Sequence, residues 1–405
     1  MILKEFESLQ CKDPEDKHYI DKVAFDAIEH FILENEDKAP YLKITTKRGL
    51  GKVLQAQNFV GVIQTKDGTT IEILPKIKQL SHEASKKILL QMLKTLKNSP
   101  FKTLDHAQLR HEKLPLLEVF IAMFLDELSI LIKKGIKSEY INKEENTPFL
   151  KGKLRLGEHI KHNTIHKERF FVAYTEFSSD RVENRLIKTT LHYLYKKSHS
   201  NQNQQRIREC LFVFDDISLS QNSLEDFLHV KNDRSMRAYE QTLLWCKTFL
   251  LGNSFSPYKG DDLAFALLFD MNILFESYVG NYLTKQGLDV RLQDRTHHLV
   301  EMPKKFALRP DIVLTCHDDK VIIADTKWKI IHHEKDISQA DMYQLFAYGK
   351  KYQNQKLYLI YPKDGEDQPQ DLSYTYDMSK ILKLDVLYFD LTSNSFSRPD
   401  LLCIE

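Results

Sequence analysis

The chain has 405 residues, of which 42% are hydrophobic and 28% charged, with only 13 glycines and 12 prolines. This composition is typical of globular proteins, and it excludes collagen-like, low-complexity and wholly disordered chains. Lys and Arg number 58 and Asp and Glu 57, a formal net charge of +1. The overall charge therefore neither favours nor disfavours a polyanionic partner, and the length predicts two or three domains.

The spacing of the cysteines and the length of the apolar runs indicate in which compartment the protein is expected. The five cysteines are far apart and form no CxxC pair, which argues against a zinc site and a disulfide framework: Cys11, Cys210, Cys246, Cys316 and Cys403. The first residues lack the basic start and apolar run of a signal peptide. Charges such as Asp126 and Asp270 interrupt the longest apolar stretches. We therefore expect a cytoplasmic protein that does not contact membranes.

The N-terminal region, residues 1–110, reads as a β-rich module. Between Tyr41 and Ile77, segments rich in β-branched residues alternate with turn residues. The pair Asp67-Gly68 predicts a tight hairpin turn in which both residues supply positive φ angles. A helix capped by Ser81 follows and runs to about Asn98.

The middle region, residues 111–255, is predicted to be mainly helical. Helices are expected over residues 116–134, with Gly135 at the C-terminal cap, and over residues 180–197. Residues 198–205 read as a polar loop. The breaker-rich segment 251–260 predicts a domain boundary.

The C-terminal region, residues 256–405, is predicted as a third domain in which helices and strands alternate. The expected elements are a helix over 261–286, strands over 307–315 and 321–330, a helix over 338–352 opened by a Ser338–Asp341 capping box, and a strand over 356–361.

The most informative stretch of this region places two acids in apolar strands. Asp311 precedes Ile-Val-Leu, and Asp325 follows Val-Ile-Ile-Ala. If the turn between the strands centres on Asp318, facing residues have numbers that sum to 636, which pairs Asp311 with Asp325. Strand alternation then puts Lys327 on the face of Asp325, with Thr326 pointing away.

Two carboxylates and an ammonium that converge in this way suit phosphodiester cleavage. Asp311 and Asp325 can hold Mg²⁺, with Mn²⁺ as a substitute, and Lys327 can assist the attacking water or offset transition-state charge. Glu276, on the predicted helix over 261–286, could supply a further metal oxygen. The alternative is an ordinary ion pair of Lys327 on an exposed hairpin, but exposed pairs do not usually lie inside apolar strands.

These residues resemble the PD-(D/E)xK nucleases. The matching elements are Pro310-Asp311, Asp325-Thr326-Lys327, and Gln344 with Tyr348 as the QxxxY element of the RecB-like branch. Gln344 and Tyr348 are four apart on the predicted helix and so share a face. Gln344 would orient Lys327 or a DNA phosphate.

The whole chain resembles the McrC family, the nuclease subunits of McrBC modification-dependent restriction systems. The stretches that carry this resemblance include Asn58-Phe-Val-Gly-Val-Ile, Thr147-Pro-Phe-Leu-Lys-Gly-Lys-Leu, Phe269-Asp-Met-Asn-Ile-Leu-Phe-Glu and Phe306-Ala-Leu-Arg-Pro-Asp-Ile. The resemblance implies a fold of mixed α+β or α/β class: an N-terminal β-rich module that contacts an NTPase partner, a helical middle, and a C-terminal PD-(D/E)xK domain.

The same resemblance implies the function and the partners. The chain would be a Mg²⁺-dependent DNA endonuclease that cleaves modified double-stranded DNA and stimulates a McrB-like hexameric AAA+ GTPase. It has no P-loop motif of its own, so another chain must drive any energy-dependent step. Two alternatives stay open: a catalytically idle activator or assembly subunit, and a standalone RecB-like repair nuclease.

Overall fold

The computed structural model forms two compact units, Met1–Leu116 with Asn253–Glu405 (unit 1) and Leu117–Gly252 (unit 2). It describes residues 1–34, 41–77, 80–97, 99–103, 114–231, 233–251, 263–316, 321–353, 356–365, 368–370, 372–376 and 382–402. Unit 2 nearly coincides with the predicted middle region. No helix of the described ranges is long and apolar enough to cross a membrane.

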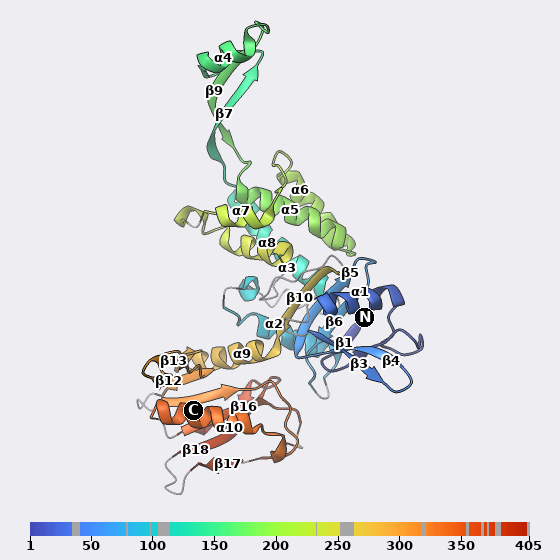
Figure 1. Cartoon of the computed structure of the whole chain (residues 1–405), viewed down its shortest axis with the longest axis vertical. Coiled ribbons are helices and arrows are strands. Elements are labelled where there is room, and N and C mark those ends of the chain that lie inside the picture. The colour runs from blue at the N-terminus through green and yellow to red at the C-terminus, as the bar shows by residue number, and fades with distance from the viewer. Residues whose placement is uncertain are drawn as a thin grey trace. The chain divides into compact units, whose positions relative to one another are not determined.

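The N-terminal part of unit 1 is the predicted β-rich module (Figure 1). Its elements are β1 Ile2–Lys4, β2 Ser8–Leu9, α1 Lys22–Glu34, β3 Leu42–Lys47, β4 Gly51–Ala56, β5 Phe59–Thr65, β6 Thr70–Leu74, α2 His82–Leu93 and the 3₁₀ turn η1 Pro100–Thr103. β2, β4 and β3 form one sheet, and β1, β6 and β5 belong to another. Ser81 caps α2 as predicted, because its side chain accepts a hydrogen bond from the Ala84 amide.

The predicted hairpin between β5 and β6 is present, with one difference in its turn. Of the pair Asp67-Gly68, only Gly68 has a positive φ, at 93°. Asp67 accepts hydrogen bonds from the hydroxyls of Thr65 and Thr69 instead. A side chain that bonds across the turn in this way stabilises it without the mirror-image turn that we predicted.

The predicted helix over 261–286 is wrong in its first part. Leu263–Asp270 is a strand, β10, that pairs antiparallel with β5 and completes the sheet β1-β6-β5-β10. The helix α9 begins only at Met271 and runs to Lys285, with Asp270 as its cap. A continuous apolar run is typical of both buried strands and buried helices. Residues 263–270 form a strand because they pair with β5, which is about 200 residues away in the sequence. The boundary segment 252–262 lies outside the described residues.

The C-terminal part of unit 1 is built on a seven-stranded sheet in the order β11-β14-β15-β16-β18-β17, with β19 on β18. Its elements are β11 Asp289–Leu292, β14 Ile312–Thr315, β15 Val321–Thr326, η4 Glu334–Asp336, α10 Gln339–Lys351, β16 Lys356–Pro362, β17 Ser373–Thr375, β18 Lys383–Asp390, β19 Ser395–Phe396 and η5 Pro399–Leu402. A separate hairpin joins β12 His298–Glu301 to β13 Lys304–Ala307. The observed order of helix, hairpin, helix and strand is the predicted one.

The central strands of this sheet form its core. β15, β16 and β18 run parallel, and α10 connects β15 to β16. Ile322, Ile323, Leu359 and Ile360 are fully buried, as expected for parallel strands covered on both faces. Cys316, directly after β14, is disulfide-bonded, whereas Cys11, Cys210 and Cys246 are free thiols.

Unit 2 combines helices with a β arm that the predicted helical middle region did not include. Its elements are α3 Leu116–Lys134, β7 Glu139–Thr147, β8 Lys153–Leu154, α4 Leu156–Asn163, β9 Phe170–Ser178, α5 Val182–Lys197, α6 Asn201–Val213, α7 Ser223–His229, η3 Arg234–Met236 and α8 Glu240–Leu251. The helices predicted near 116–134 and 180–197 are confirmed. The predicted loop 198–205 is wrong, because Ser200 caps α6 there.

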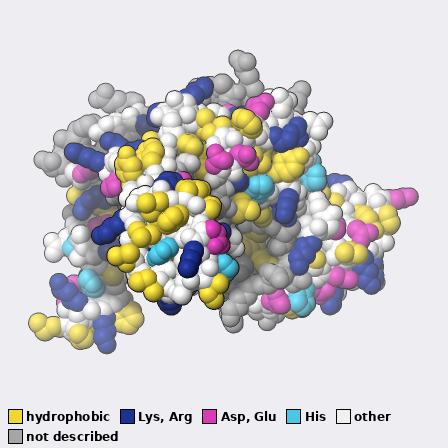
Figure 2. Space-filling model, turned by 90° about the horizontal axis from the view of Figure 1, so that it is seen from above, with side chains coloured by type: hydrophobic (Ala, Val, Ile, Leu, Met, Phe, Trp, Pro, Cys, Tyr) yellow, Lys and Arg dark blue, Asp and Glu magenta, His cyan; other side chains and the backbone are white. Residues whose placement is uncertain are grey.

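The arm is a sheet in the order β7-β9-β8 that ends in the short helix α4 (Figure 1). Figure 2 looks onto this end and shows hydrophobic side chains gathered there. Phe149, Leu150, Leu156 and Ile160 are each 59–66% exposed. Clustered exposed apolar groups of this kind mark interaction surfaces in soluble proteins.

Candidate active site

The two acids singled out in the sequence meet at one end of the β14–β15 hairpin. Ile312 pairs with Ala324 and Val313 with Ile323, so the numbers of facing residues sum to 636 as predicted. Asp311 immediately precedes β14 and is therefore brought next to Asp325 of β15. The turn at Asp318 lies outside the described residues. The strand register predicted from it is confirmed.

Asp325 is a buried carboxylate whose hydrogen-bonding capacity is not filled. Asp325 is only 1% exposed to solvent. Lys327 Nζ lies 2.7 Å from Oδ2, whereas Oδ1 has no hydrogen-bond partner among the described residues. Burial and the nearby Asp311 charge raise the pKa of Asp325 to about 7, although Lys327 acts in the other direction. A buried acid with a bare oxygen is costly unless a cation compensates it.

Lys327 lies on the same face as Asp325, as predicted, and its side chain is 28% exposed. Its Nζ is also 3.9 Å from Asp341 of α10. Burial disfavours the charged ammonium, but the surrounding carboxylates outweigh burial and raise the pKa of Lys327. The lysine therefore stays cationic and faces both the acids and solvent.

Asp311 is held by two residues that the sequence did not indicate. Its Oδ2 accepts hydrogen bonds from the Thr326 amide at 2.8 Å and the Thr326 hydroxyl at 2.9 Å. Its Oδ1 accepts one from Gln293 Nε2 at 3.1 Å. The prediction that Thr326 points away from the site is wrong, because its hydroxyl as well as its amide donates to Asp311. Burial raises the pKa of Asp311 despite these bonds.

Glu276 joins the site from α9. Gln293 Nε2 donates to Glu276 Oε2 at 2.8 Å as well as to Asp311, so one amide links the two acids. Burial, followed by the Asp311 charge, raises the pKa of Glu276 to about 8. Gln293 has a positive φ of 51° and follows β11, and no local sequence signal identifies such a position.

The donor set fits a Mg²⁺ ion held by two carboxylates. Among the described residues, no group of three or more His, Cys, Asp or Glu is placed to hold a metal ion. Mg²⁺, however, commonly uses only one or two protein carboxylates and completes its octahedron with water and substrate oxygens. The bare Oδ1 of Asp325 and the neighbouring Asp311 provide such a pair.

Gln344 and Tyr348 share a face of α10, as predicted, but Gln344 bonds to Tyr348, and Tyr348 bonds to the backbone that precedes Asp311. Gln344 Nε2 donates to the Tyr348 hydroxyl at 2.6 Å, and this hydroxyl donates to the Arg309 carbonyl at 3.0 Å. No hydrogen bond or ion pair joins Gln344 to Lys327 in the described part of the chain. Tyr348 therefore supports the backbone two residues before Asp311.

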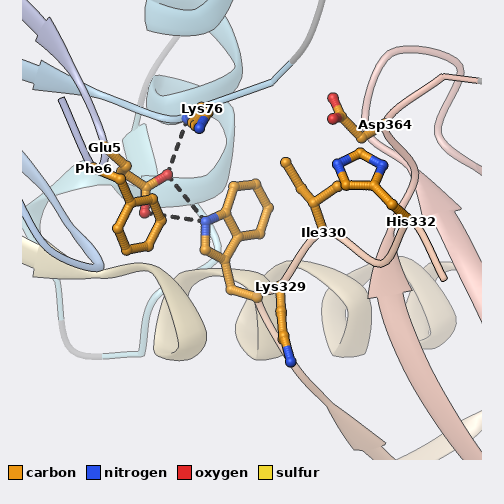
Figure 3. Close-up of a pocket in the computed structure, with 8 residues that line it drawn as sticks. Glu5, Phe6, Lys76, Lys329, Ile330, His332 and Asp364 are labelled. Atoms are coloured by element: carbon orange, nitrogen blue, oxygen red, sulfur yellow. Dashed lines mark hydrogen bonds between the residues drawn. The ribbon is translucent and has the colours of Figure 1, made fainter. Parts of the chain in front are cut away.

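Trp328 fixes the chain immediately after Lys327. Its indole Nε1 donates to both oxygens of Glu5, at 3.1 and 3.0 Å, and its amide donates to Asn272 at 3.2 Å. Glu5 and Trp328 line a cavity of about 410 Å³, and Figure 3 shows Glu5 in it with its hydrogen bonds. Glu5 is fully buried and also accepts a bond from the Lys76 amide. The N-terminal module thus anchors the residue next to the candidate catalytic lysine.

Comparisons with known proteins agree with this architecture. A family model described as McrBC 5-methylcytosine restriction system component matches residues 54–362. No curated protein sequence matches the chain.

Two solved structures contain similar chains. One is a refined half-complex from the tetradecameric assembly of Thermococcus gammatolerans McrB AAA+ hexamers with bound McrC: TM-score 0.71, 18% identity, covering 100% of this chain and 98% of that chain. The other is the cryo-EM structure of the Thermococcus gammatolerans McrBC complex: TM-score 0.51, 20% identity, covering 72% and 89%. At these identities the likeness establishes a shared fold.

Proposed function

Because this chain belongs to the McrBC 5-methylcytosine restriction system component family, we propose that it is a Mg²⁺-dependent DNA endonuclease subunit of a McrBC-like complex. The observation that carries the proposal is the cluster of Asp311, Lys327 and the buried Asp325, in which one oxygen of Asp325 lacks a partner among the described residues. The order of α9, β14–β15, α10 and β16 also agrees with a PD-(D/E)xK domain.

The chain's residues have distinct roles in this reaction. Asp311 and Asp325 would hold the Mg²⁺, which when bound supplies Lewis acidity and lowers the pKa of water. Thr326 and Gln293 fix the Asp311 carboxylate through the bonds described above. Lys327 presents a positive charge where the pentacovalent phosphate develops negative charge. Glu276 is tied to Asp311 through Gln293 and was expected to donate a further oxygen to the metal, but it does not form a three-carboxylate metal site with Asp311 and Asp325 among the described residues.

We propose a hexameric AAA+ GTPase as the partner and modified double-stranded DNA as the substrate, with the complex acting in the cytoplasm. The similar chain in the 0.71 TM-score structure is described in an assembly of McrB AAA+ hexamers with bound McrC. The exposed apolar tip of the arm offers a surface that a protein partner could cover. In this proposal the partner supplies nucleotide hydrolysis and this chain cuts DNA.

The test is cleavage of modified DNA by the reconstituted complex with GTP and Mg²⁺. Asp311→Ala should abolish cleavage while GTP hydrolysis by the partner is still stimulated. Asp289→Ala is the matched control, because Asp289 is an exposed carboxylate on the neighbouring strand β11. Cleavage by Asp311→Ala at the wild-type rate would refute the assignment.

The same experiment separates the alternatives. An idle activator predicts no metal-dependent cleavage by the wild type but full stimulation of the GTPase. A standalone nuclease predicts robust cleavage by this chain with Mg²⁺ alone, without the partner.

A further inference from the structure

Lys327 has a second carboxylate within reach, on the helix α10. Its Nζ lies 2.7 Å from Oδ2 of Asp325 and 3.9 Å from Oδ1 of Asp341. Gln344 was expected to orient Lys327 from α10, but it is Asp341, three residues earlier, that lies near the lysine. The two acids differ in the proposed site, because Asp325 is a metal ligand and Asp341 is not.

The Asp341 carboxylate has no other partner in the described part of the chain. The predicted capping box would bond it to the Ser338 amide, but Ser338 caps α10 through its own side chain, which accepts from the Ala340 amide at 3.2 Å. Leu345, one turn further along the helix, is fully buried, so this face of α10 is turned towards the sheet. Among the described residues, only Lys327 is therefore placed to neutralise Asp341.

The ammonium of Lys327 can change partners without a change in the backbone. The Lys327 amide donates to the Ile360 carbonyl at 2.9 Å, which ties this residue to β16. Beyond Cα, the lysine side chain is a flexible four-carbon stem that ends in a compact charge. Moving Nζ from Asp325 towards Asp341 therefore requires only rotations about side-chain bonds.

A divalent cation and the Lys327 ammonium compete for Asp325. The ammonium occupies Oδ2 of this acid, and two positive charges on one carboxylate repel each other strongly in a site of low dielectric constant. An ammonium that left Asp325 without a new partner would be a partly buried, uncompensated charge, which is costly. Asp341 offers the replacement, because its carboxylate is already close to Nζ.

We propose that Asp341 is a positioning residue that takes over Lys327 when a divalent cation occupies Asp311 and Asp325. This inference rests on the nuclease function proposed above. With Lys327 on Asp325, one ligand oxygen is taken. With Lys327 on Asp341, both metal ligands are free and the ammonium stays beside them. Asp341 thus strengthens metal binding through Lys327, without itself contacting the metal.

The test is a double-mutant cycle of metal binding by the full chain, without DNA or nucleotide. The Kd for Mn²⁺ is measured by electron paramagnetic resonance of the free ion for the wild type, Asp341→Asn, Lys327→Met and the double variant. Asp341→Asn should weaken binding by about 10-fold, as is typical when a residue outside the ligand shell is lost. Lys327→Met should tighten binding, because the competing ammonium is gone. In the Lys327→Met background, Asp341→Asn should then have no further effect.

Two control variants accompany the cycle. Asp341→Glu keeps the charge and should keep most of the affinity. Asp289→Asn removes an exposed charge on β11 and should bind Mn²⁺ like the wild type.

The cycle separates a positioning role from a direct one. An equal loss from Asp341→Asn in both backgrounds would mean that Asp341 acts on the metal itself, and this would overturn the proposal. Wild-type affinity in Asp341→Asn, or weaker binding by Lys327→Met, would do the same. If the wild type binds Mn²⁺ no more tightly than Asp325→Asn, the metal site of the proposed function is absent, and the positioning role is refuted with it.

Cleavage of DNA by the reconstituted complex provides a second measurement. Asp341→Asn should raise the Mg²⁺ concentration that gives half-maximal cleavage, and a high Mg²⁺ concentration should restore part of the rate. A rate that falls equally at every Mg²⁺ concentration would place Asp341 in a later step and contradict the proposal.

Discussion

Glu5 and Asp325 are both buried acids in unit 1, and the pKa of each is raised to about 7, chiefly by burial. Their surroundings differ. Both oxygens of Glu5 accept hydrogen bonds from Trp328, and one also accepts from the Lys76 amide. Asp325 has one oxygen near Lys327 and one without a partner among the described residues, and it lies next to a second acid, Asp311.

The difference shows that a raised pKa alone does not identify a catalytic acid. Neutral donors satisfy Glu5, which makes it a structural link between the N-terminal module and Trp328, the residue after Lys327. Asp325 is left with unused coordination capacity and an unfavourable like charge, an arrangement that a divalent cation would relieve. The distribution of partners, more than the extent of burial, separates the two roles.

The largest expected effect comes from removing the charge of Asp325, which should abolish most DNA cleavage without lowering the stability of the fold. Asp325→Asn should reduce DNA cleavage at least about 1000-fold, roughly 4 kcal/mol, because the metal and the transition-state charge lose a ligand. Its free energy of unfolding should not fall, because the substitution removes the repulsion from Asp311. Cleavage rates and urea unfolding curves at pH 8 test both statements, and a strongly destabilised variant would contradict the second.

The pH dependence of stability provides the corresponding test of Glu5. Its pKa is about 7 when folded and near the ordinary glutamate value of 4.5 when unfolded, so the folded state binds the proton more tightly. Its contribution to the free energy of unfolding is therefore complete below about pH 4.5. It falls as the pH rises to about 7, by about 3 kcal/mol.

Glu5→Gln should remove this part of the pH dependence. Asp325 and Glu276 titrate in an overlapping range in both proteins, so their effects cancel in the difference. Trp328→Phe keeps the carboxyl but removes the indole donor that lowers its pKa, and it should make the pH dependence steeper. Urea unfolding at several pH values between 5 and 8 measures these changes. Parallel curves for wild type and Glu5→Gln would show that Glu5 does not titrate in this range.

The sequence predicted the parts of this site that depend on local geometry. The pairing of Asp311 with Asp325 follows from the centre of one turn, and the shared face of Gln344 and Tyr348 follows from helical spacing. Gln293 was missed because its role depends on the pairing of β11 with β14 and on an unusual backbone angle. Glu5 was missed because its partner, Trp328, lies 323 residues away. The strand β10 was assigned to a helix for the same reason, since its partner is β5.

Metal binding should distinguish the two acids directly. If Mn²⁺ binds between Asp311 and Asp325, a concentration of ten times Kd should stabilise the wild type by about 1.4 kcal/mol. Thermal unfolding with and without Mn²⁺ should show this stabilisation for the wild type and Glu5→Gln, and lose it in Asp325→Asn. A shift that persists in Asp325→Asn would place the ion elsewhere.

The smallest expected effect concerns the support of Asp311 from α10. Tyr348→Phe removes the hydroxyl that binds the Arg309 carbonyl and accepts from Gln344, and this should cost about 1 kcal/mol of stability. Tyr343→Phe on the same helix is the control. Tyr343 is 64% exposed, and among the described residues its hydroxyl forms a hydrogen bond only with Gln339.

The Tyr348 variant should also lower the rate of DNA cleavage by a few fold. Arg309 lies two residues before Asp311, and a shifted Asp311 carboxylate would hold its metal less well. Equal stability and equal cleavage in the two variants would mean that the carbonyl contact does not position the acid.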